Sequence, residues 1–365
     1  MKVLFDHQIF FIQRYGGISR YFSRLAEGLT HLNQDVKILS GINTNAYLTE
    51  MPSGLVVGKQ IRKFPSKSQG LLKRINSFYE ATYESFYTPQ LIHETYFGAD
   101  SFKRSNAIRV VGLYDMIQEK FPDLFPSENP TLLAKKAALQ RADHIISISQ
   151  HSKDDCCEIL GIDESKISVV HLAADSPFKD LESIELELNR PFFLYVGDRN
   201  GYKNFNILLK AFAQSEKLKS DFSLVSFGGP PFSKTELAQF ESLGLTKDHV
   251  KYFSGEDRIL GKLYSLACAL VYPSLYEGFG IPPLEAMNYD CPVLASNTSC
   301  IPEIVGSGGV LFDPHNCEEL SYLLEKLSED SFYRGELIDE GVQRREQFSW
   351  GKTAVETIQV YKSLL

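Results

Sequence analysis

A chain of 365 residues, 43% of them hydrophobic, is long for a single hydrophobic core, so two domains are expected. With 25 phenylalanines and 18 tyrosines, it lacks the composition of a disordered or low-complexity protein. A net charge of −8 argues against general binding of nucleic acid, for which a basic balance is expected.

The cysteines and the apolar segments narrow the class further. The six cysteines form no C-x-x-C pair, and no Cys/His group has the spacing of zinc ligands. Residues 1–7 reach an acid and a histidine too early for a signal peptide, and no apolar run approaches the roughly 20 residues of a membrane span. We therefore expect a cytoplasmic protein without a resident metal.

The start of the chain has the pattern of a β–α–β unit. Strands are expected at 2–5 and 36–39, and apolar residues recur at helical spacing between 18 and 32. Such a unit predicts a parallel sheet. Gly16 and Gly17 precede the helix, where these sheets bind ligands. A Gly-Gly pair also serves simply as a turn, and the G-x-G-x-x-G fingerprint is absent.

Residues 59–74 form a positively charged segment in this otherwise acidic chain. They contain six basic side chains and no acid, and several aromatic residues follow between 78 and 87. Such a segment can dock on an anionic lipid surface or hold an acceptor that carries a diphosphate. The alternative is a solvated loop before a helix whose aromatic side chains pack inward.

The first sheet continues with strands at 108–113 and 144–149. The earlier of these strands leads to Tyr114 and Asp115 at its carboxyl end, which is the ligand-binding edge of an open α/β sheet. From 174 to 190 the periodicity is lost and acidic residues accumulate, which is typical of an exposed link between domains.

After this link, the alternation of strands and helices begins again. Strands are expected at 192–196, 223–227, 250–253, 269–272, 292–295 and 310–312, with helical segments between most of them. The second half is therefore predicted to be a second doubly wound domain. A last helix, at 350–365, is expected to pack back on the first domain.

One stretch of the second half, residues 273–287, has the features of a ligand site. Gly278 and Gly280 allow a close approach of backbone, and two prolines then mark the start of a helix. A helix N-terminus after a parallel strand suits a phosphate group. Glu277 and Glu285 lie on either side, so these two carboxylates should reach different parts of one polar ligand.

A second charged loop precedes this stretch in the chain. Arg199 and Lys203 follow the strand at 192–196, and both are cationic at neutral pH, so both can reach one diphosphate. Taken alone, the pair is more simply a solvated charged loop. The stretch at 273–287 favours the ligand interpretation.

Together, these motifs resemble the signature of glycosyltransferase family 4. The matching pieces are YGGISRY at 15–21, VGDR at 196–199 with KN at 203–204, PSLYEGFGIP at 273–282, LEAM at 284–287, PVLAS at 292–296, PEIVG at 302–306 and LFDP at 311–314. The likeness covers nearly the whole chain and is strongest over the second half. Two glutamates separated by seven residues in this context are far more specific than any lone glycine motif.

The resemblance implies the GT-B fold, in which two doubly wound, Rossmann-like α/β domains face each other across a cleft. Residues 1–173 would form the acceptor-binding domain and 191–349 the nucleotide-sugar-binding domain, with 174–190 as the linker. The resemblance also implies transfer with retention of anomeric configuration and without a metal or other cofactor. The leaving phosphate would accept the acceptor's proton, so no general base is expected.

The resemblance assigns roles to the charged residues. Glu277 would contact donor sugar hydroxyls, Glu285 the ribose hydroxyls, and Arg199 and Lys203 the diphosphate leaving group. The residues expected to hold the donor are Gly16, Gly17, Tyr114, Gly255, Gly278, Phe279, Gly280, Ile281 and Glu285.

One position departs from the family pattern. Related enzymes often carry a histidine just before the aspartate of the first domain's strand-end loop, and here that position is Tyr114, followed by Asp115. Asp115 is expected to belong to the catalytic group. Either Tyr114 makes the hydroxyl contact of the missing histidine or another residue does so.

The sequence therefore predicts a retaining hexosyltransferase, and mannose from GDP-mannose is the leading choice of donor. The acceptor is expected to be a saccharide, lipid-linked, in surface polysaccharide or O-antigen biosynthesis, with the enzyme peripheral on the inner face of the membrane. The alternatives are a hexosyltransferase that uses a UDP-sugar, a nucleotide-sugar epimerase on the same fold, and a nucleotide-sugar sensor. The intact charged residues argue against the sensor.

Overall fold

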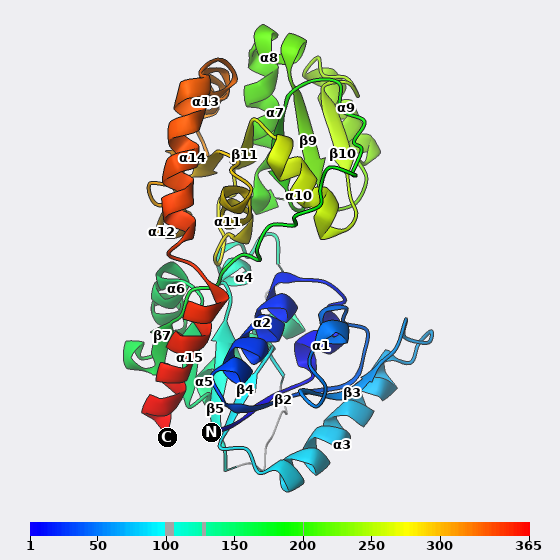
Figure 1. Ribbon diagram of the computed structural model, residues 1–365, viewed down its shortest axis with the longest axis vertical. Coiled ribbons are helices and arrows are strands. Elements are labelled where there is room, and N and C mark those ends of the chain that lie inside the picture. The colour runs from blue at the N-terminus through cyan, green and yellow to red at the C-terminus, as the bar shows by residue number, and fades with distance from the viewer. Residues whose placement is uncertain (99–105, 126–128, 200) are drawn as a thin grey trace. The chain divides into compact units, whose positions relative to one another are not determined.

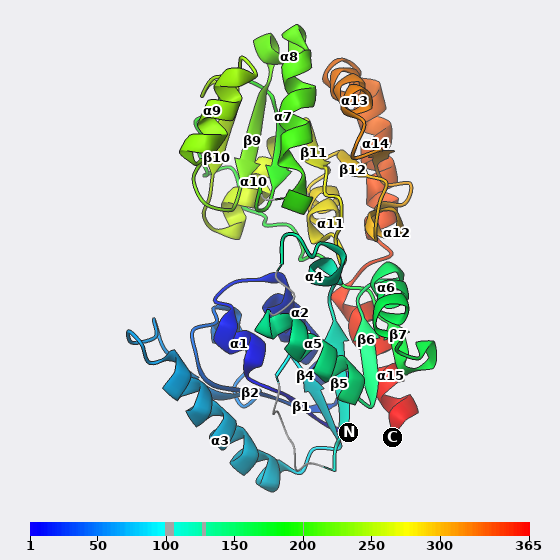
Figure 2. The same cartoon turned by 180° about the vertical axis from the view of Figure 1, so that it is seen from behind.

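The computed structural model describes residues 1–98, 106–125, 129–199 and 201–365. It divides into two compact units (Figures 1 and 2). The first unit comprises Met1–Leu172 together with Trp350–Leu365, and the second comprises Ala173–Ser349. Residues 174–190 contain no helix or strand and belong to the second unit.

The first unit is built on a parallel sheet with helices on both of its faces (Figures 1 and 2). The strand order across the sheet is β3 (Val56–Gln60), β2 (Asp35–Asn43), β1 (Lys2–Phe5), β4 (Leu91–Glu94), β5 (Ile108–Leu113), β6 (His144–Ser147) and β7 (Ile167–Val169). The helices are α1 (Gln8–Ile12), α2 (Gly17–His31), α3 (Gln69–Tyr87), α4 (Ile117–Lys120), α5 (Pro130–Arg141), α6 (Gln150–Leu160) and α15 (Trp350–Leu364), with short 3₁₀ turns η1 (Tyr47–Glu50) and η2 (Glu164–Lys166).

Helix α15 returns the chain to the first unit and packs along α2. The two helices approach closely where Gly28 faces Ala354, because a Cβ added to Gly28 would lie 2.7 Å from the Ala354 Cβ. At the other end of α15, the hydroxyl of Tyr361 lies 2.7 Å from Nδ1 of His93, which is fully buried. The last helix is therefore part of the core of the first unit.

The second unit repeats this plan with a parallel sheet of its own. The strand order is β10 (Val250–Phe253), β9 (Ser223–Phe227), β8 (Phe192–Val196), β11 (Ala269–Tyr272), β12 (Val293–Ser296) and β13 (Val310–Phe312). The helices are α7 (Phe205–Gln214), α8 (Glu216–Asp221), α9 (Lys234–Ser242), α10 (Asp257–Leu266), α11 (Ile281–Asn288), α12 (Ile301–Val305), α13 (Cys317–Glu329) and α14 (Ser331–Arg345), with the 3₁₀ turn η3 (Gly201–Lys203).

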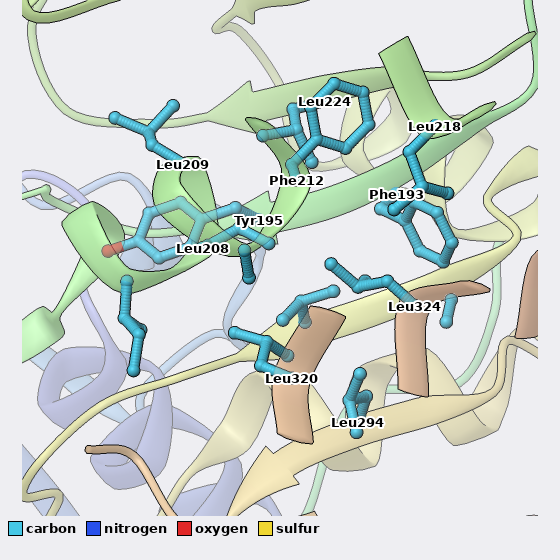
Figure 3. Close-up of a cluster of buried hydrophobic side chains, with 14 of the residues drawn as sticks. Phe193, Tyr195, Leu208, Leu209, Phe212, Leu218, Leu224, Leu294, Leu320 and Leu324 are labelled. Atoms are coloured by element: carbon cyan, nitrogen blue, oxygen red, sulfur yellow. The ribbon is translucent and has the colours of Figure 1, made fainter. Parts of the chain in front are cut away.

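The core on one face of this second sheet joins strands and helices that are far apart in the sequence. Phe193 of β8 and Phe212 of α7 pack with Leu320 and Leu324 of α13 (Figure 3). All four side chains are completely buried. Burying a large apolar side chain contributes about 1.5–3 kcal/mol, so this cluster holds the sheet that carries the loops described below.

The order of strands places a switch point in each sheet. In the second sheet, β8 is followed by β9 on one side, and the chain later returns to its other side as β11. In the first sheet, β1 lies between β2 and β4 in the same way. In open α/β sheets, ligands bind outside the carboxyl ends of the strands at such a point.

Two parts of the first unit differ from expectation. Strands β3 and β4 were not predicted, because both are short and end in polar residues. The aromatic residues of α3 do not all pack inward: Phe78 and Phe86 are 77% and 82% exposed, whereas Tyr83 packs on a buried cluster.

Candidate active site

The two charged loops of the second unit lie side by side at its switch point. One loop follows β8 and contains Lys203, and the other follows β11 and contains Glu277. The backbone joins them directly, because the N–H of Leu275 donates to the carbonyl of Tyr202 at 2.7 Å. The sheet thus brings together residues that are 74 positions apart in the sequence.

Lys203 and Glu277 form an ion pair at this point. The ammonium Nζ lies 2.7 Å from Oε1 and 3.0 Å from Oε2 of Glu277, whose side chain is almost buried. Burial on its own would lower the pKa of Lys203, but the charge and hydrogen bond of Glu277, together with the effects of Tyr202 and Asp198, outweigh burial and raise that pKa. Lys203 is therefore firmly cationic at neutral pH.

Tyr272, the last residue of β11, adjoins the pair. Its ring lies 5.9 Å from Nζ of Lys203, measured to the ring centre. Burial and the charge of Glu277 raise the pKa of the Tyr272 phenol well above its usual value, so this hydroxyl stays protonated.

The backbone of Glu277 is held by residues that the sequence did not single out. Its N–H donates to Oγ of Ser299 at 3.0 Å, and its carbonyl accepts from the buried thiol of Cys300 at 3.1 Å. Both partners come from the loop before α12, and Ser299 adopts a φ of 52°. A serine in this left-handed conformation is uncommon, and only the structure reveals it.

Helix α11 begins directly after this loop. Gly280 precedes it with a φ of 96°, a conformation that disfavours side chains, and Pro282 and Pro283 occupy its first turn. Phe279 is buried, with its ring 6.1 Å from that of Phe348. Its side chain therefore packs into the protein, and the backbone from Gly278 to Gly280 leads into the helix, which begins at Ile281.

Glu285 lies one turn inside α11. Its Oε2 accepts from the hydroxyl of Tyr264 on α10 at 3.1 Å, and the side chain is half-buried. The two glutamates of the motif thus stand at different places on the same loop and helix, as their spacing predicts.

Arg199 has partners other than the Lys203–Glu277 pair. Its Nε donates to Glu236 Oε1 at 2.6 Å, and its two terminal nitrogens donate to the carbonyls of Gly228 at 3.2 Å and Pro230 at 2.6 Å. The guanidinium also lies 4.7 Å from the ring centre of Phe232, and its side chain is 3% exposed. These contacts brace the loop after β9, so a direct bond to a diphosphate would require some of them to break.

Gly255 follows β10 on the same edge of the sheet. It has a φ of 144°, and an added Cβ would lie 2.6 Å from Cδ1 of Ile259. A glycine is therefore required for the local turn, and contact between its backbone and a nucleotide base stays a prediction.

In the first unit, Gly16 and Gly17 lie at the N-terminus of α2. A Cβ at Gly16 would be 2.4 Å from Oε1 of Gln13, which in turn accepts from the N–H of Ser19 at 3.2 Å. The glutamine side chain thus covers the start of the helix and would have to move if Gly16 carried a side chain.

Tyr114 and Asp115 follow β5, as expected, but Tyr114 turns back into the sheet. Its hydroxyl donates to the carbonyl of Thr95 at 2.9 Å, and its side chain is buried over Gly112. A contact of this hydroxyl with a sugar would require that bond to break. The Asp115 side chain is 34% exposed; its Oδ1 accepts from the N–H of Ile117 at 3.0 Å and lies 3.9 Å from Nζ of Lys135.

A buried charged cluster at the switch point of the first sheet was not predicted. Asp6 is fully buried directly after β1, and burial together with the charge of Glu80 raises its pKa to about 6. His7 is hydrogen-bonded to Glu80 of α3, and Glu94 at the end of β4 is ion-paired with Arg141. The sequence signal was the Asp-His pair immediately after the first strand.

The described ranges contain neither a metal-binding cluster nor a helix suited to cross a membrane. Among residues 1–98, 106–125, 129–199 and 201–365, no group of three or more His, Cys, Asp or Glu is arranged to hold a metal ion. In the same ranges, none of the helices combines the length and apolar character needed to span a bilayer.

Comparison with known families assigns both halves of the chain. Residues 15–176 match the model for Glycosyltransferase Family 4, and residues 178–344 match the model for Glycosyl transferases group 1. The chain belongs to the family 4 glycosyltransferases. The resemblance inferred from the sequence motifs is thereby confirmed.

Several curated glycosyltransferases are similar in sequence. O-antigen chain mannosyltransferase B of Escherichia coli is 29% identical over 257 residues, which are 67% of each chain. The serotype-specific mannosyltransferase WbdA of Escherichia coli is 29% identical over 66% of this chain. This chain spans about a third of that relative, since the match covers 31% of its length.

Solved structures of glycosyltransferases share the fold. Sucrose-phosphate synthase from Thermosynechococcus elongatus has a TM-score of 0.77 at 21% identity, covering 100% of this chain and 98% of that one. Anabaena Alr3699/HepE in complex with UDP-glucose has a TM-score of 0.77 at 19% identity, covering 100% of both chains. The predicted class of two Rossmann-like domains of the GT-B type is therefore confirmed for this glycosyltransferase.

Proposed function

We propose that this glycosyltransferase moves a hexose, mannose from GDP-mannose, to a saccharide hydroxyl with retention of configuration. The observation that carries this proposal is the Lys203–Glu277 pair at the switch point, next to the N-terminus of α11. The names of the curated relatives support mannose and O-antigen synthesis. A UDP-hexose is the alternative donor, favoured by the UDP-glucose in the similar Anabaena structure.

In this proposal, the diphosphate of the donor lies between Lys203 and the start of α11. An ammonium group has three N–H donors, and two of them suffice for the carboxylate of Glu277, so the third is directed at a phosphate oxygen. Pro282 and Pro283 have no N–H, so the N-terminus of α11 adds the N–H of Ile281 and the positive end of the helix dipole. Together they stabilise the negative charge that develops on the leaving diphosphate, without a metal.

The remaining roles follow from position. Glu277 accepts from hydroxyls of the donor sugar while its backbone is held by Ser299 and Cys300. Glu285, with two acceptor oxygens, binds the ribose hydroxyls. Arg199 acts through the loop that it braces, and Asp115 contacts the donor sugar from the first unit.

Helix α3 adds an apolar surface to the proposed membrane-binding segment at residues 59–74. This helix turns two polar side chains toward the protein: Asn76, which bonds both backbone groups of Ile42 at 2.8 and 3.1 Å, and Glu80, which pairs with His7. Its solvent-facing apolar residues are Leu71, Ile75, Phe78, Tyr79 and Phe86. An exposed apolar stripe beside a basic segment fits an anionic membrane, so we place the enzyme at the inner membrane surface with a lipid-linked acceptor.

A panel of nucleotide sugars tests the donor. GDP-mannose at about 100 times its dissociation constant should stabilise the folded enzyme by about 2.7 kcal/mol, measured as a rise in melting temperature. UDP-glucose and UDP-galactose serve as comparisons. Stabilisation by none of them would contradict the proposal, and stabilisation by a UDP-sugar alone would move the donor to the alternative.

Product analysis tests the reaction class. Transfer requires an acceptor, whereas an epimerase would convert the nucleotide sugar without one, so conversion in the absence of acceptor would contradict transfer. The anomeric configuration of the product, read by NMR, tests retention. Full activity in excess EDTA is expected, and a loss that Mg²⁺ or Mn²⁺ restores would contradict metal independence.

Co-sedimentation tests the membrane role. Binding to phosphatidylcholine vesicles that contain a minor share of anionic phosphatidylglycerol should fall when Lys73 and Arg74 become Glu, and also in Phe78→Ser. Phe332→Ser is the matched control, because Phe332 is a similarly exposed phenylalanine of the second unit. Equal binding of the wild type and the α3 variants would favour the interpretation as a solvated surface.

A further inference from the structure

A cavity of about 670 Å³ lies at the carboxyl edge of the first sheet, and none of the residues expected to hold the donor lines it. Its lining consists of Arg14, Thr44, Arg62, Lys63, Phe64 and Gln69. A neighbouring cavity of about 250 Å³ shares Arg14, Thr44 and Arg62 with it. The larger volume falls in the range of about 300–1,000 Å³ that is typical of small-ligand sites.

The sheet topology explains why these residues meet. Thr44 directly follows β2, and Arg62 and Lys63 follow β3, while Arg14 comes from the connection after β1 and α1. The three strands are parallel neighbours, so their carboxyl ends share one edge. Gln69 is the first residue of α3, which leaves the same edge.

Hydrogen bonds between these loops hold the cavity open. Asn45 donates through its side chain to the carbonyl of Gln13 at 2.7 Å, and its own carbonyl accepts from the Gln60 side chain at 2.6 Å. The N–H of Ala46 donates to the carbonyl of Arg14 at 2.9 Å, and the N–H of Ile61 to that of Asn43 at 2.8 Å. A cavity fixed in this way loses little conformational entropy when a ligand binds.

The charge of the cavity is uncompensated. Within the described part of the chain, no carboxylate lies at ion-pair distance from Arg14, Arg62 or Lys63. Three cations around one cavity, with a threonine hydroxyl and a glutamine amide beside them, match a ligand that carries several negative oxygens. In a chain of net charge −8, such a cluster is a specific feature.

The surroundings of the cavity indicate what is attached to that anion. Phe64 forms one wall and packs on Phe11, with ring centres 4.6 Å apart. The exposed apolar stripe of α3 starts at Leu71, two residues after Gln69. An anion held here would therefore have an apolar surface beside it, as the diphosphate of a membrane lipid requires.

We propose that this cavity binds the diphosphate that joins a saccharide acceptor to its lipid, and so selects acceptors by their lipid diphosphate. This inference rests on the proposed function, because it assigns a place for the acceptor of that reaction. Phosphate oxygens are also present in phospholipid headgroups, so the test must separate a diphosphate from a headgroup.

The first arm uses inorganic pyrophosphate and calorimetric titration. Lys203→Ala removes the cation expected to bind pyrophosphate in the second unit, and it serves as the background for both variants. On that background, Arg62→Ala with Lys63→Ala should weaken pyrophosphate binding at least about tenfold, since each charge-assisted hydrogen bond contributes about a factor of ten or more. Lys59→Ala with Lys67→Ala, which changes the net charge equally outside the cavity lining, should leave it within about twofold.

The second arm uses vesicles. Phosphatidylcholine vesicles that carry a trace of undecaprenyl diphosphate should bind the cavity variant about tenfold more weakly than the control variant. Vesicles of phosphatidylcholine and phosphatidylglycerol without that lipid should bind both variants equally. If the cavity variant loses only phosphatidylglycerol binding, the cavity holds a headgroup and the acceptor assignment is wrong.

The outcomes separate this inference from the proposed function. Equal pyrophosphate binding by the cavity and control variants, while the wild type binds a nucleotide sugar, would overturn the inference alone. Failure of the wild type to bind any nucleotide sugar would overturn the proposed function, and the pyrophosphate titration would still report on the cavity. Circular dichroism and melting temperature establish that both variants fold.

Discussion

Both units carry basic side chains at the carboxyl edge of their sheets, but the two sets differ in whether they are paired with carboxylates. In the second unit, Lys203 is paired with Glu277, and Arg199 with Glu236. In the described part of the first unit, Arg14 and Arg62 line a cavity with no carboxylate at ion-pair distance. A paired charge holds its side chain in one geometry before a ligand binds. The charge of an unpaired side chain is neutralised only when an anionic ligand binds.

This difference bears on how each site would recognise its substrate. A lysine that is ion-paired and nearly buried is held in a fixed position, and solvent screens its charge poorly. Such a group suits stabilisation of a charge that develops during a reaction. Unpaired arginines on an open cavity suit attraction of an anion that is already charged, and their effect should weaken with salt. The contrast can be tested residue by residue.

The largest effect is expected for the paired lysine. Lys203→Ala should lower kcat by about 10²–10³-fold, because it removes the cation that stabilises the leaving diphosphate. Lys210→Ala, on the exposed face of α7, is the matched control and should leave kcat unchanged. A near-normal kcat for Lys203→Ala, with a folded protein, would mean that the Lys203–Glu277 pair is structural.

Substitution of Arg199 should change the stability of the fold directly and the reaction rate only indirectly. Arg199→Ala removes bonds to two loop carbonyls and to Glu236, and should lower the free energy of unfolding by about 2–3 kcal/mol. Glu236→Gln, which keeps an acceptor, should cost clearly less in the same urea titrations. If Arg199→Ala instead keeps full stability while activity collapses, Arg199 contacts the diphosphate as the sequence alone suggested.

The third prediction concerns His93, an ionisable side chain that is uncharged in the interior of the first unit. Burial lowers its pKa to about 3, so the unfolded chain takes up a proton near pH 6.5 while the folded chain does not. Stability contributed by neutral His93 is therefore lost as the pH falls below 6.5, by about 2 kcal/mol at pH 5. Asp6 and Glu94, whose pKa values are raised, change stability in the opposite direction.

The measurement for His93 is a difference between two proteins. His93→Asn cannot titrate and keeps an oxygen for the Tyr361 hydroxyl, so its unfolding free energy should lose the part of the pH dependence that His93 contributes. Urea unfolding of both proteins at pH 5 and pH 8 gives the comparison. The same pH dependence in both would show that the pKa of His93 does not differ between the folded and unfolded states.

The smallest effect is expected at Glu285. Glu285→Ala should weaken binding of the free nucleoside diphosphate by about tenfold, through loss of the bonds to ribose. Tyr264→Phe removes the hydroxyl that bonds to Glu285 without touching the carboxylate, and should weaken binding less. An unchanged affinity in Glu285→Ala would remove the ribose contact from the proposal.

Sequence reasoning found the second-unit site because its parts are local. Glu277, the glycines and Glu285 lie on one loop and helix, and the spacing of the two glutamates is visible in the chain. The partners of Glu277 were missed because Ser299 and Cys300 contact it only through its backbone, across a gap of more than twenty residues. The inward turn of Arg199 was missed because it depends on carbonyls of a loop about thirty residues away.

The first unit was harder to predict for a different reason. Periodicity shows that α3 has two faces but not which one meets the protein, and that choice depends on Ile42 and His7, which bond to its polar residues. The basic cavity collects side chains from three connections along the chain, so only the order of the strands brings them together. The positive charge of 59–74 was visible, whereas its meeting with Arg14 was not.

The return of α15 to the first unit has a consequence for how the protein is made. The first unit lacks Tyr361, the partner of His93, until residues 350–364 have followed the whole second unit out of the ribosome. The second unit is continuous in the chain and can fold during synthesis, while the first waits with the α2 surface uncovered. Loss of the last helix should therefore expose an aggregation-prone apolar surface in the unit that was synthesised first.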